Sequence, residues 1–211
     1  MLDLPTLVLF VSASVVLTLA PGPDIIFLIT QGVTKGRRAG FATAMGLASG
    51  CLVHTLGAAL GVSVVFRTSA LAFQTLKIAG VVYLLYLAWK TIRAPQTDAA
   101  IAPSHEPTED EGRALYFRGV LMNLLNPKVA LFFLAFLPQF ASPERGAVWM
   151  QMVLLGIIFT AQVVVIFGSI GLFAGHVSMW LRRGPLGKAG RYMKWAVAAV
   201  YVSLALRLAR A

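Results

Sequence analysis

Long, nearly uninterrupted apolar runs are the feature that most limits how this chain can fold. A helix needs about 20 apolar residues to cross the roughly 30 Å hydrocarbon core of a bilayer, and the runs reach or approach that length. Because they do not alternate with period two, helices are favoured over the strands of a membrane β-barrel. The sequence therefore predicts an all-α integral membrane protein with about six transmembrane helices. The runs are residues 4–31, 40–66, 69–89, 119–140, 147–175 and 192–208.

Composition supports a membrane protein and argues against nucleic acid as a partner. Only 12% of the 211 residues are charged, against about a quarter in soluble domains. The net charge of +10 comes from Lys and Arg in short loops between apolar runs, as in membrane proteins. Asp3 stands where a secretory signal carries basic residues, so we expect the first run to remain as a span. The single cysteine, Cys51, cannot form an intrachain disulfide or a thiol metal cage, and we expect no cofactor.

The runs form two groups of three around an acidic, proline-containing linker. We predict one transmembrane domain over residues 1–211, with a first repeat at 1–93, a solvated linker at 94–111 and a second repeat at 112–211. An odd number of spans per repeat inserts the second repeat upside down, an arrangement typical of secondary transporters. Two pairs of similar motifs suggest the repeat, although chance is an alternative: Pro23-Asp24 with Pro127-Lys128, and Lys77-Ile78-Ala79 and Tyr83 with Lys194-Trp195-Ala196 and Tyr201.

The distribution of Lys and Arg predicts the orientation in the membrane. These residues are dense after the first, third and fifth runs and sparse after the others. Cytoplasmic loops carry the excess of Lys and Arg, so we place the dense loops inside and both termini outside. The dense loops contain Lys35, Arg37, Arg38, Lys90, Arg93, Arg113, Arg118, Arg182, Arg183, Lys188, Arg191 and Lys194.

Asp24 and Lys128 are ionisable side chains placed well inside apolar runs. A charge at the centre of a span costs about 2.5 to 3.5 kcal/mol on an insertion scale, so such residues are by default candidates for function. Counted from the predicted cytoplasmic ends at roughly 1.5 Å per residue, Asp24 lies about 10 Å deep and Lys128 about 15 Å deep. The two side chains can therefore meet and bind substrate, with Asp24 also carrying a proton. A purely structural ion pair is the alternative.

Prolines stand directly before both charges. Pro23 and Pro127 lack an N–H donor and obstruct a carbonyl one turn back, so each run should kink or break there. Irregular backbone inside a membrane must be covered by protein or line a cavity. A half-helix that starts at Asp24 or Lys128 would point N–H groups and a positive dipole end into such a cavity, which suits a carboxylate. A kink that serves packing alone is the alternative.

Further polar side chains could complete the site. Asn123 and Asn126 flank the break in the fourth run, and Gln162 is expected to be buried in the middle of the fifth. His54 could relay protons because its ordinary pKa is near physiological pH. A neutral histidine bonded to a neighbouring helix is the alternative interpretation. Glycines at Gly46, Gly50, Gly57 and Gly61 predict a close approach of helix backbones.

Three sequence motifs, taken together, resemble one family. They are Thr18-Leu19-Ala20-Pro21-Gly22-Pro23-Asp24, then Gly36-Arg37-Arg38-Ala39-Gly40 with Gly46 and Gly50, and Asn123-Leu124-Leu125-Asn126-Pro127-Lys128 running into Phe136-Leu137-Pro138-Gln139-Phe140. They resemble the lysine exporter family, in particular its homoserine, threonine and leucine exporter branch. The resemblance implies a six-helix secondary carrier of the bacterial inner membrane that exports zwitterionic amino acids in exchange for protons. The apolar faces also allow a homodimer.

Three other classes fit the sequence less well. An intramembrane enzyme needs a nucleophile with its base, or a metal site, placed together, and the runs show neither. An exporter of metal cations, as in a related family, would need clustered His, Cys or carboxylates, and Lys128 would repel its cargo. A non-transporting membrane protein would be more stable without charges in its spans, because each such charge costs free energy. Accumulation assays in cells lacking the gene would separate such a protein from an exporter.

Overall fold

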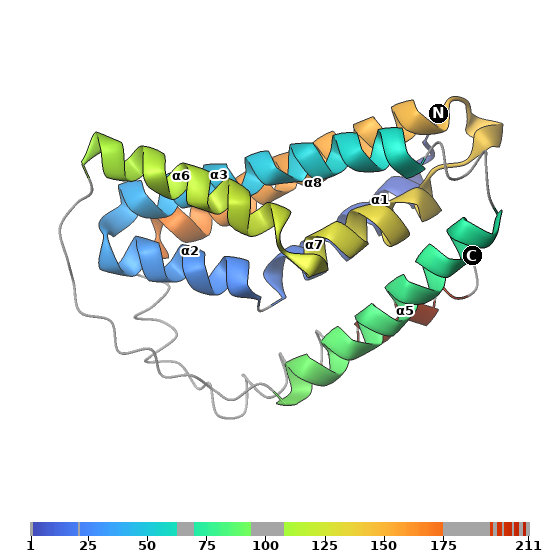
Figure 1. Ribbon diagram of the computed structural model, residues 1–211, viewed down its shortest axis with the longest axis horizontal. Helices are drawn as coiled ribbons and strands as arrows, with labels where there is room; N and C mark the ends of the chain where they lie inside the picture. The colour runs from blue at the N-terminus through green and yellow to red at the C-terminus, as the bar shows by residue number, and fades with distance from the viewer. Residues whose placement is uncertain are drawn as a thin grey trace.

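The computed structural model describes residues 2–20, 22–62, 70–93, 108–174 and scattered positions between 195 and 209. Every regular element within these ranges is a helix, which agrees with the all-α prediction (Figure 1). The predicted run at 192–208 lies largely outside the described residues. The α-helices are α1 (Leu4–Leu19), α2 (Pro23–Thr34), α3 (Gly36–Gly57), α5 (Ala70–Arg93), α6 (Glu109–Leu124), α7 (Pro127–Leu131) and α8 (Val148–Leu172), joined by π-helical η1 (Ala58–Val62) and η2 (Phe132–Phe136) and by 3₁₀ turns η3 (Leu137–Phe140) and η4 (Pro143–Arg145).

Two of the described helices are each long and apolar enough to cross a membrane. One is α3 with its π-helical extension, Gly36–Gly61, and the other is α8. Two further pairs, α1 with α2 and α6 with the segment Pro127–Phe140, pass the same test together but are bent by 59° and 51°. The described part of the chain therefore holds two spans, or up to four if each bent pair is one span. This supports a multi-pass membrane protein.

Both bends fall at the predicted prolines. Gly22 is extended, with φ −154° and ψ 173°, and α2 starts at the next residue, Pro23. In the second half, Asn126 is extended and α7 starts at Pro127. Proline suits the first position of a helix because the N–H that it lacks has no partner there in any case. The prediction that both apolar runs break at these motifs is confirmed.

Helix α3 packs closely against α6 and α8. Gly46 faces the backbone carbonyl of Tyr116 in α6, and Gly40 faces the backbone of Gly171 in α8. A Cβ atom at Gly40 or Gly46 would collide with the facing backbone, so these contacts require glycine. For two other glycines the prediction is wrong as far as the described residues go, because none of their atoms lies within 4 Å of a Cβ built at Gly57 or Gly61.

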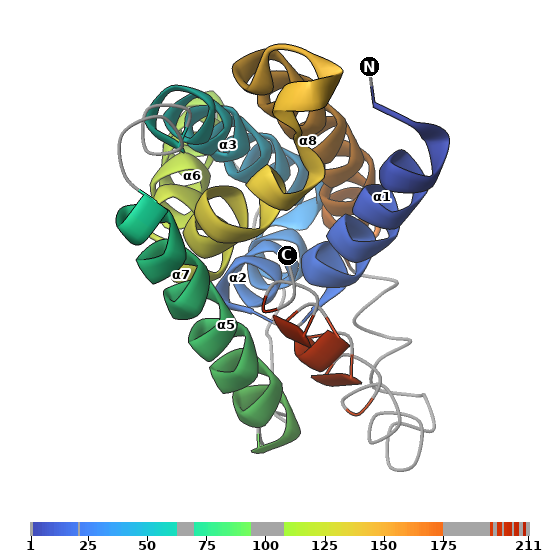
Figure 2. The ribbon, with the colours of Figure 1, turned by 90° about the vertical axis from the view of Figure 1, so that its right-hand side faces the viewer.

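A cluster of phenylalanine rings packs between α1, the turns after α7 and α8. The ring of Phe10 in α1 lies 5.2 Å from that of Phe140, and Phe132 lies 5.0 Å from Phe159 in α8. These contacts hold the π-helical and 3₁₀ turns after α7 between α1 and α8. Helix α5 packs on the same turns, at η2, and lies along the side of the bundle away from α8 (Figure 2).

Helix α6 begins earlier than the apolar run predicts. Thr108 caps it through a reciprocal pair of bonds, with the Glu111 N–H donating to Thr108 Oγ1 at 3.4 Å and the Thr108 N–H donating to Glu111 Oε2 at 3.0 Å. Such a capping box satisfies two backbone donors at the helix start. The last three acids of the predicted linker, from Glu109 to Glu111, are therefore helical.

Candidate functional site

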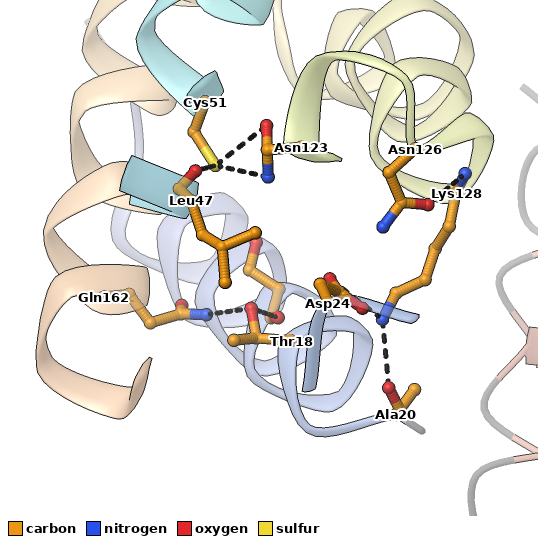
Figure 3. A network of polar contacts seen from close by, with 10 residues as sticks. Thr18, Ala20, Asp24, Leu47, Cys51, Asn123, Asn126, Lys128 and Gln162 are labelled. Carbon is orange, nitrogen blue, oxygen red and sulfur yellow. Dashed lines mark hydrogen bonds and ion pairs between the residues drawn. The ribbon is translucent and has the colours of Figure 1, made fainter. Parts of the chain in front are cut away.

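Asp24 and Lys128 occupy equivalent places at the two breaks. Each is the second residue of a helix that starts at proline, and their exposed fractions are 2% and 5%. The Lys128 ammonium lies 3.9 Å from Asp24 Oδ2, so the two side chains form a buried ion pair between the halves of the chain (Figure 3). A buried charge without a partner is costly, and this pairing lowers the cost of both.

The helix ends around the pair match its charges. Lys128 Nζ donates a hydrogen bond of 3.0 Å to the backbone carbonyl of Ala20, directly after α1. A helix C-terminus carries partial negative charge and favours this cation, whereas Asp24 lies in the first turn of α2, where partial positive charge favours an anion. At the bend, the partially negative C-terminus of α1 and the partially positive N-terminus of α2 therefore lie close together, beside the ion pair.

The two half-helices differ in how their first turns are capped. The Asn126 side chain accepts a 3.0 Å hydrogen bond from the Lys128 N–H and so caps α7. Gly22, at the same place before α2, offers no side chain for capping. The first N–H groups of a helix have no partner within the helix. The start of α2 therefore retains donors that a ligand carboxylate can use.

Gly22 also makes room for the ion pair. A Cβ built on it would lie 2.6 Å from Asp24 Oδ1 and 3.4 Å from Lys128 Nζ. The first distance is shorter than real carbon–oxygen contacts, so any larger residue would displace the carboxylate. The absence of a side chain at Gly22 is therefore part of the site's geometry.

Several buried polar side-chain atoms lack a hydrogen-bond partner among the described residues. They are Asp24 Oδ1, Asn126 Nδ2, Gln162 Oε1 and Ser14 Oγ. Most buried polar groups in proteins are bonded, and leaving one unbonded costs about 1 to 3 kcal/mol. Of the four residues, Asp24 lines the cavity described next, so water or a ligand there can complete the bonding of its Oδ1 atom.

A small cavity adjoins the ion pair and has room for about one water molecule. Besides Asp24 and Lys128, its wall consists of Leu17, Thr18, Cys51, Asn123, Val129, Phe159, Val163 and Phe167. A second small cavity touches Lys128 from the α5 side, where Tyr83 and Phe132 are among its lining residues. A ligand as large as an amino acid fits the first cavity only if helices move apart.

The remaining predicted residues take different places around this cavity. Asn123 lines it and pairs with Cys51, whose Sγ atom accepts from Asn123 Nδ2 at 3.6 Å. His54 Nε2 lies 3.2 Å from the Asn123 carbonyl oxygen, and the ring stacks on Phe133. The structure thus bonds His54 to a neighbouring helix, next to a residue of the wall and not in the wall itself.

Gln162 differs from its prediction. It is half-buried instead of buried. Its side chain reaches the site indirectly, since Nε2 donates a 3.2 Å hydrogen bond to Thr18 Oγ1 (Figure 3). Thr18 and Ala20 belong to the first motif that carries the family resemblance, but the sequence predicted no role in the site for either. Thr18 is a polar residue shortly before a predicted break, which is a signal that could have identified it.

The described residues contain no group of three or more His, Cys, Asp or Glu side chains that could hold a metal ion. The charged pair is suited to a ligand that carries both signs of charge. The arrangement offers an anion, a cation and unbonded polar atoms in one occluded place between two broken helices.

Comparisons with known proteins point to one family. The family model described as LysE type translocator matches residues 15–211. A homoserine/homoserine lactone efflux protein of Salmonella typhimurium is 31% identical over 176 residues, which cover 83% of each chain. A leucine efflux protein of Klebsiella pneumoniae is 27% identical, over 95% of this chain and 92% of its own. An uncharacterized membrane protein of Vibrio cholerae is 35% identical, over 82% and 83%. No solved structure matches.

Proposed function

The chain belongs to the LysE type translocator family, and from this membership we propose that it exports amino acids or close derivatives from the cytoplasm. The relatives named for efflux of homoserine, homoserine lactone and leucine support this class of substrate. The observation that carries the proposal is the buried pair of Asp24 and Lys128 beside a cavity at two helix breaks. A membrane protein of purely structural role has no need to bury two charges.

The pair is complementary to a zwitterion. An amino acid presents an ammonium and a carboxylate a few ångströms apart, and a site with one fixed charge of each sign pairs both without leaving net charge buried. In this proposal Asp24 binds the substrate ammonium. Lys128, Asn126 Nδ2 and the first N–H groups of α2 bind the carboxylate. Without substrate, Asp24 and Lys128 pair with each other, as at the observed 3.9 Å. Asn123 contributes to the wall.

The proposed architecture is six transmembrane helices in two inverted three-helix repeats. Support comes from the matched breaks, in which Pro23-Asp24 starts α2 and Pro127-Lys128 starts α7. Such repeats allow a site to open to one side of the membrane and then to the other. The cavity holds only about one water molecule, so the described conformation is closed and transport requires the halves to separate.

The proposed driving force is exchange with protons. Asp24 is the first candidate carrier, because protonation would release the substrate ammonium and weaken its pairing with Lys128. His54 is the second candidate, through its contact with the Asn123 carbonyl beside the wall. The inner membrane, with both termini outside, is the proposed location. The orientation follows from the dense Lys and Arg after the first, third and fifth runs, and the inner membrane is what the family resemblance implies.

The test is efflux from loaded cells. Bacteria without their own exporters are loaded with one labelled amino acid, and efflux is measured with and without this protein while unlabelled amino acids compete. We expect faster efflux of a neutral amino acid, and slower efflux after an uncoupler removes the proton gradient. Efflux no faster than with an Asp24→Asn, Lys128→Gln double variant would refute the function. Efflux that the uncoupler does not slow would refute proton coupling but not the export of amino acids.

A further inference from the structure

The end of α6 is held against α3 by three residues on one side of that helix, Gly50, Cys51 and His54. A Cβ built on Gly50 would lie 2.7 Å from Asn123 Cβ, so the Asn123 side chain lies directly against the α3 backbone. Asn123 Nδ2 donates to Cys51 Sγ at 3.6 Å, and His54 Nε2 lies 3.2 Å from the Asn123 carbonyl oxygen. Helix α3 therefore contacts Asn123 at both its side chain and its backbone.

The contact between His54 and the Asn123 carbonyl requires a donor on the imidazole ring. A carbonyl oxygen only accepts hydrogen bonds, so Nε2 carries a hydrogen here, in the neutral ring and in the charged ring alike. The carbonyl cannot take this hydrogen over, and neither can Phe133, whose ring centroid lies 5.7 Å from that of His54. These two contacts suit a residue that holds its neighbour in place, and neither passes a proton on.

The same carbonyl connects His54 to the break that carries Lys128. The Asn123 oxygen has two lone pairs, and it accepts a second bond of 3.0 Å from the Asn126 N–H. The Asn126 side chain in turn accepts from the Lys128 N–H at 3.0 Å (Figure 3). A continuous path of hydrogen bonds therefore runs from α3 through the break to the backbone of Lys128, whose ammonium lies 3.9 Å from Asp24 Oδ2.

The break between α6 and α7 depends on bonds of this kind. The last C=O groups of one helix and the first N–H groups of the next have no partner within their own helices. The bend here is 51°, and Leu125, which lies within it, is 73% exposed. The bonds at Asn123 support the break from the α3 side, directly before the residue that carries the buried ammonium.

We infer that His54 is a positioning residue of the proposed substrate site, which acts by holding the Asn123 carbonyl and, through it, Lys128. The inference rests on the proposed function, because it assumes that Lys128 binds the substrate carboxylate. It gives the two candidates for proton coupling different roles. Asp24 exchanges the proton, and His54 supplies a hydrogen-bond donor for which a neutral amide can substitute. Loss of this donor should weaken substrate binding, since small displacements of a binding group are costly, and should leave proton coupling intact.

The test replaces His54 with three neutral side chains. Nε2 of glutamine is as many bonds from Cα as Nε2 of histidine, so His54→Gln keeps a donor within reach of the Asn123 carbonyl. His54→Asn has the same amide one carbon shorter, and His54→Met has the length of glutamine without a donor. Val53→Met, at the neighbouring position that is 51% exposed, is the control for the methionine substitution.

Efflux per molecule in the membrane is measured over a range of internal substrate concentrations, with and without an uncoupler. The probe is labelled leucine or labelled homoserine, whichever the wild type exports faster. We expect His54→Gln to keep the KM and the uncoupler sensitivity of the wild type. His54→Asn and His54→Met should raise KM by about tenfold, with much smaller changes in the maximal rate and in the amount of protein. Val53→Met should behave as the wild type.

Two results would overturn the inference while the proposed function stands. Export by His54→Gln that no longer responds to the uncoupler would show that His54 itself carries the proton. Equal KM values for His54→Gln and His54→Asn would show that the donor does not position the site, and this comparison remains decisive if His54→Met does not reach the membrane. If the wild type exports neither probe faster than the double variant of Asp24 and Lys128, the proposed function fails and the role given to His54 fails with it.

Discussion

At the scale of single residues, the chain buries two opposite charges and gives each a helix end that suits it. Asp24 lies in the first turn of α2, and the Lys128 ammonium contacts the Ala20 carbonyl after α1. The pair is 3.9 Å apart, longer than a tight hydrogen bond, and Asp24 Oδ1 has no described partner. Because the ion pair is long and Asp24 Oδ1 is still available as an acceptor, replacing the contact between the two side chains with contacts to a substrate costs little free energy.

The first prediction concerns the charges themselves. Asp24→Asn or Lys128→Gln alone should abolish export and lower the amount of protein in the membrane, because the remaining charge is unpaired at a cost of about 3 to 5 kcal/mol. The double variant should recover abundance without recovering export. Quantitative blotting of membranes and efflux per molecule test both claims. Near wild-type export by either single variant would show that the Asp24–Lys128 pair is structural and does not bind substrate.

A second residue-scale prediction concerns the space beside the pair. Gly22→Ala places a Cβ 2.6 Å from Asp24 Oδ1, so the flexible carboxylate must move while the backbone can stay. We expect a folded, membrane-inserted protein whose export falls about tenfold or more, since small misplacements of binding groups are costly. Gly57→Ala is the matched control, because its Cβ would meet no atom of the described residues within 4 Å. Equal export by the two variants would contradict the role given to Gly22.

At the scale of elements, two interrupted helices position the site. In each half an extended residue is followed by proline and then by a charge, so the charge enters a first helical turn inside the bundle. Close packing of α3 on α6 and α8 through Gly40 and Gly46 supplies the frame around these breaks. At the breaks Ala20 and Asn126 are buried, as irregular backbone in a membrane requires, whereas the neighbouring Leu125 is 73% exposed.

The element-scale prediction distinguishes the linker from the helix start that follows it. Deleting residues 97–104 should leave the amount and thermal stability of the membrane protein unchanged, because Ile101 is the one large apolar side chain in this part of the linker. Deleting 104–111 removes Thr108 and Glu111, which cap α6, and caps contribute about 1 kcal/mol. We expect a lower melting temperature for the second deletion only. Loss of folded protein in the first would show that the segment docks on the bundle.

At the scale of the whole molecule, the two ends of the bundle differ. At one end the start of α3 meets the end of α8 through Gly40 and Gly171. At the other end Arg145 donates to Asp3 Oδ2 at 3.0 Å and to Thr6 Oγ1 at 3.2 Å. Hydrogen bonds from Thr6 and the nearby Arg145 hold the pKa of the Asp3 carboxyl below its usual value. The contact ties the start of α1 to the turn before α8.

The whole-molecule prediction is that the basic loops after the first, third and fifth runs face the cytoplasm. Single cysteines beside Arg37, Arg93 and Arg183, in a Cys51→Ala background, should resist an impermeant thiol reagent added to intact cells. A cysteine at the exposed Glu144, near the opposite end, should react and serves as the positive control. Labelling at any of the three basic positions would require a different topology.

A homodimer, also predicted, is measured in the same preparations by cross-linking.

The sequence by itself determined the features that depend on local composition. Apolar runs predict helices because a bilayer leaves the backbone no other donors and acceptors, and prolines predict where those helices break. The cost of a charge in lipid singled out Asp24 and Lys128 without any knowledge of their neighbours.

Only the tertiary structure decided which of these groups meet. It placed Lys128 3.9 Å from Asp24 and against the Ala20 carbonyl and brought Thr18 to Gln162. In the part of the chain that the structure describes, it left Gly57 without a close neighbour. These contacts join residues far apart in the chain, and they depend on how whole helices pack and cross. A periodic pattern states which side of a helix is apolar, but not which partner lies against it, because many packings bury the same apolar surface equally well.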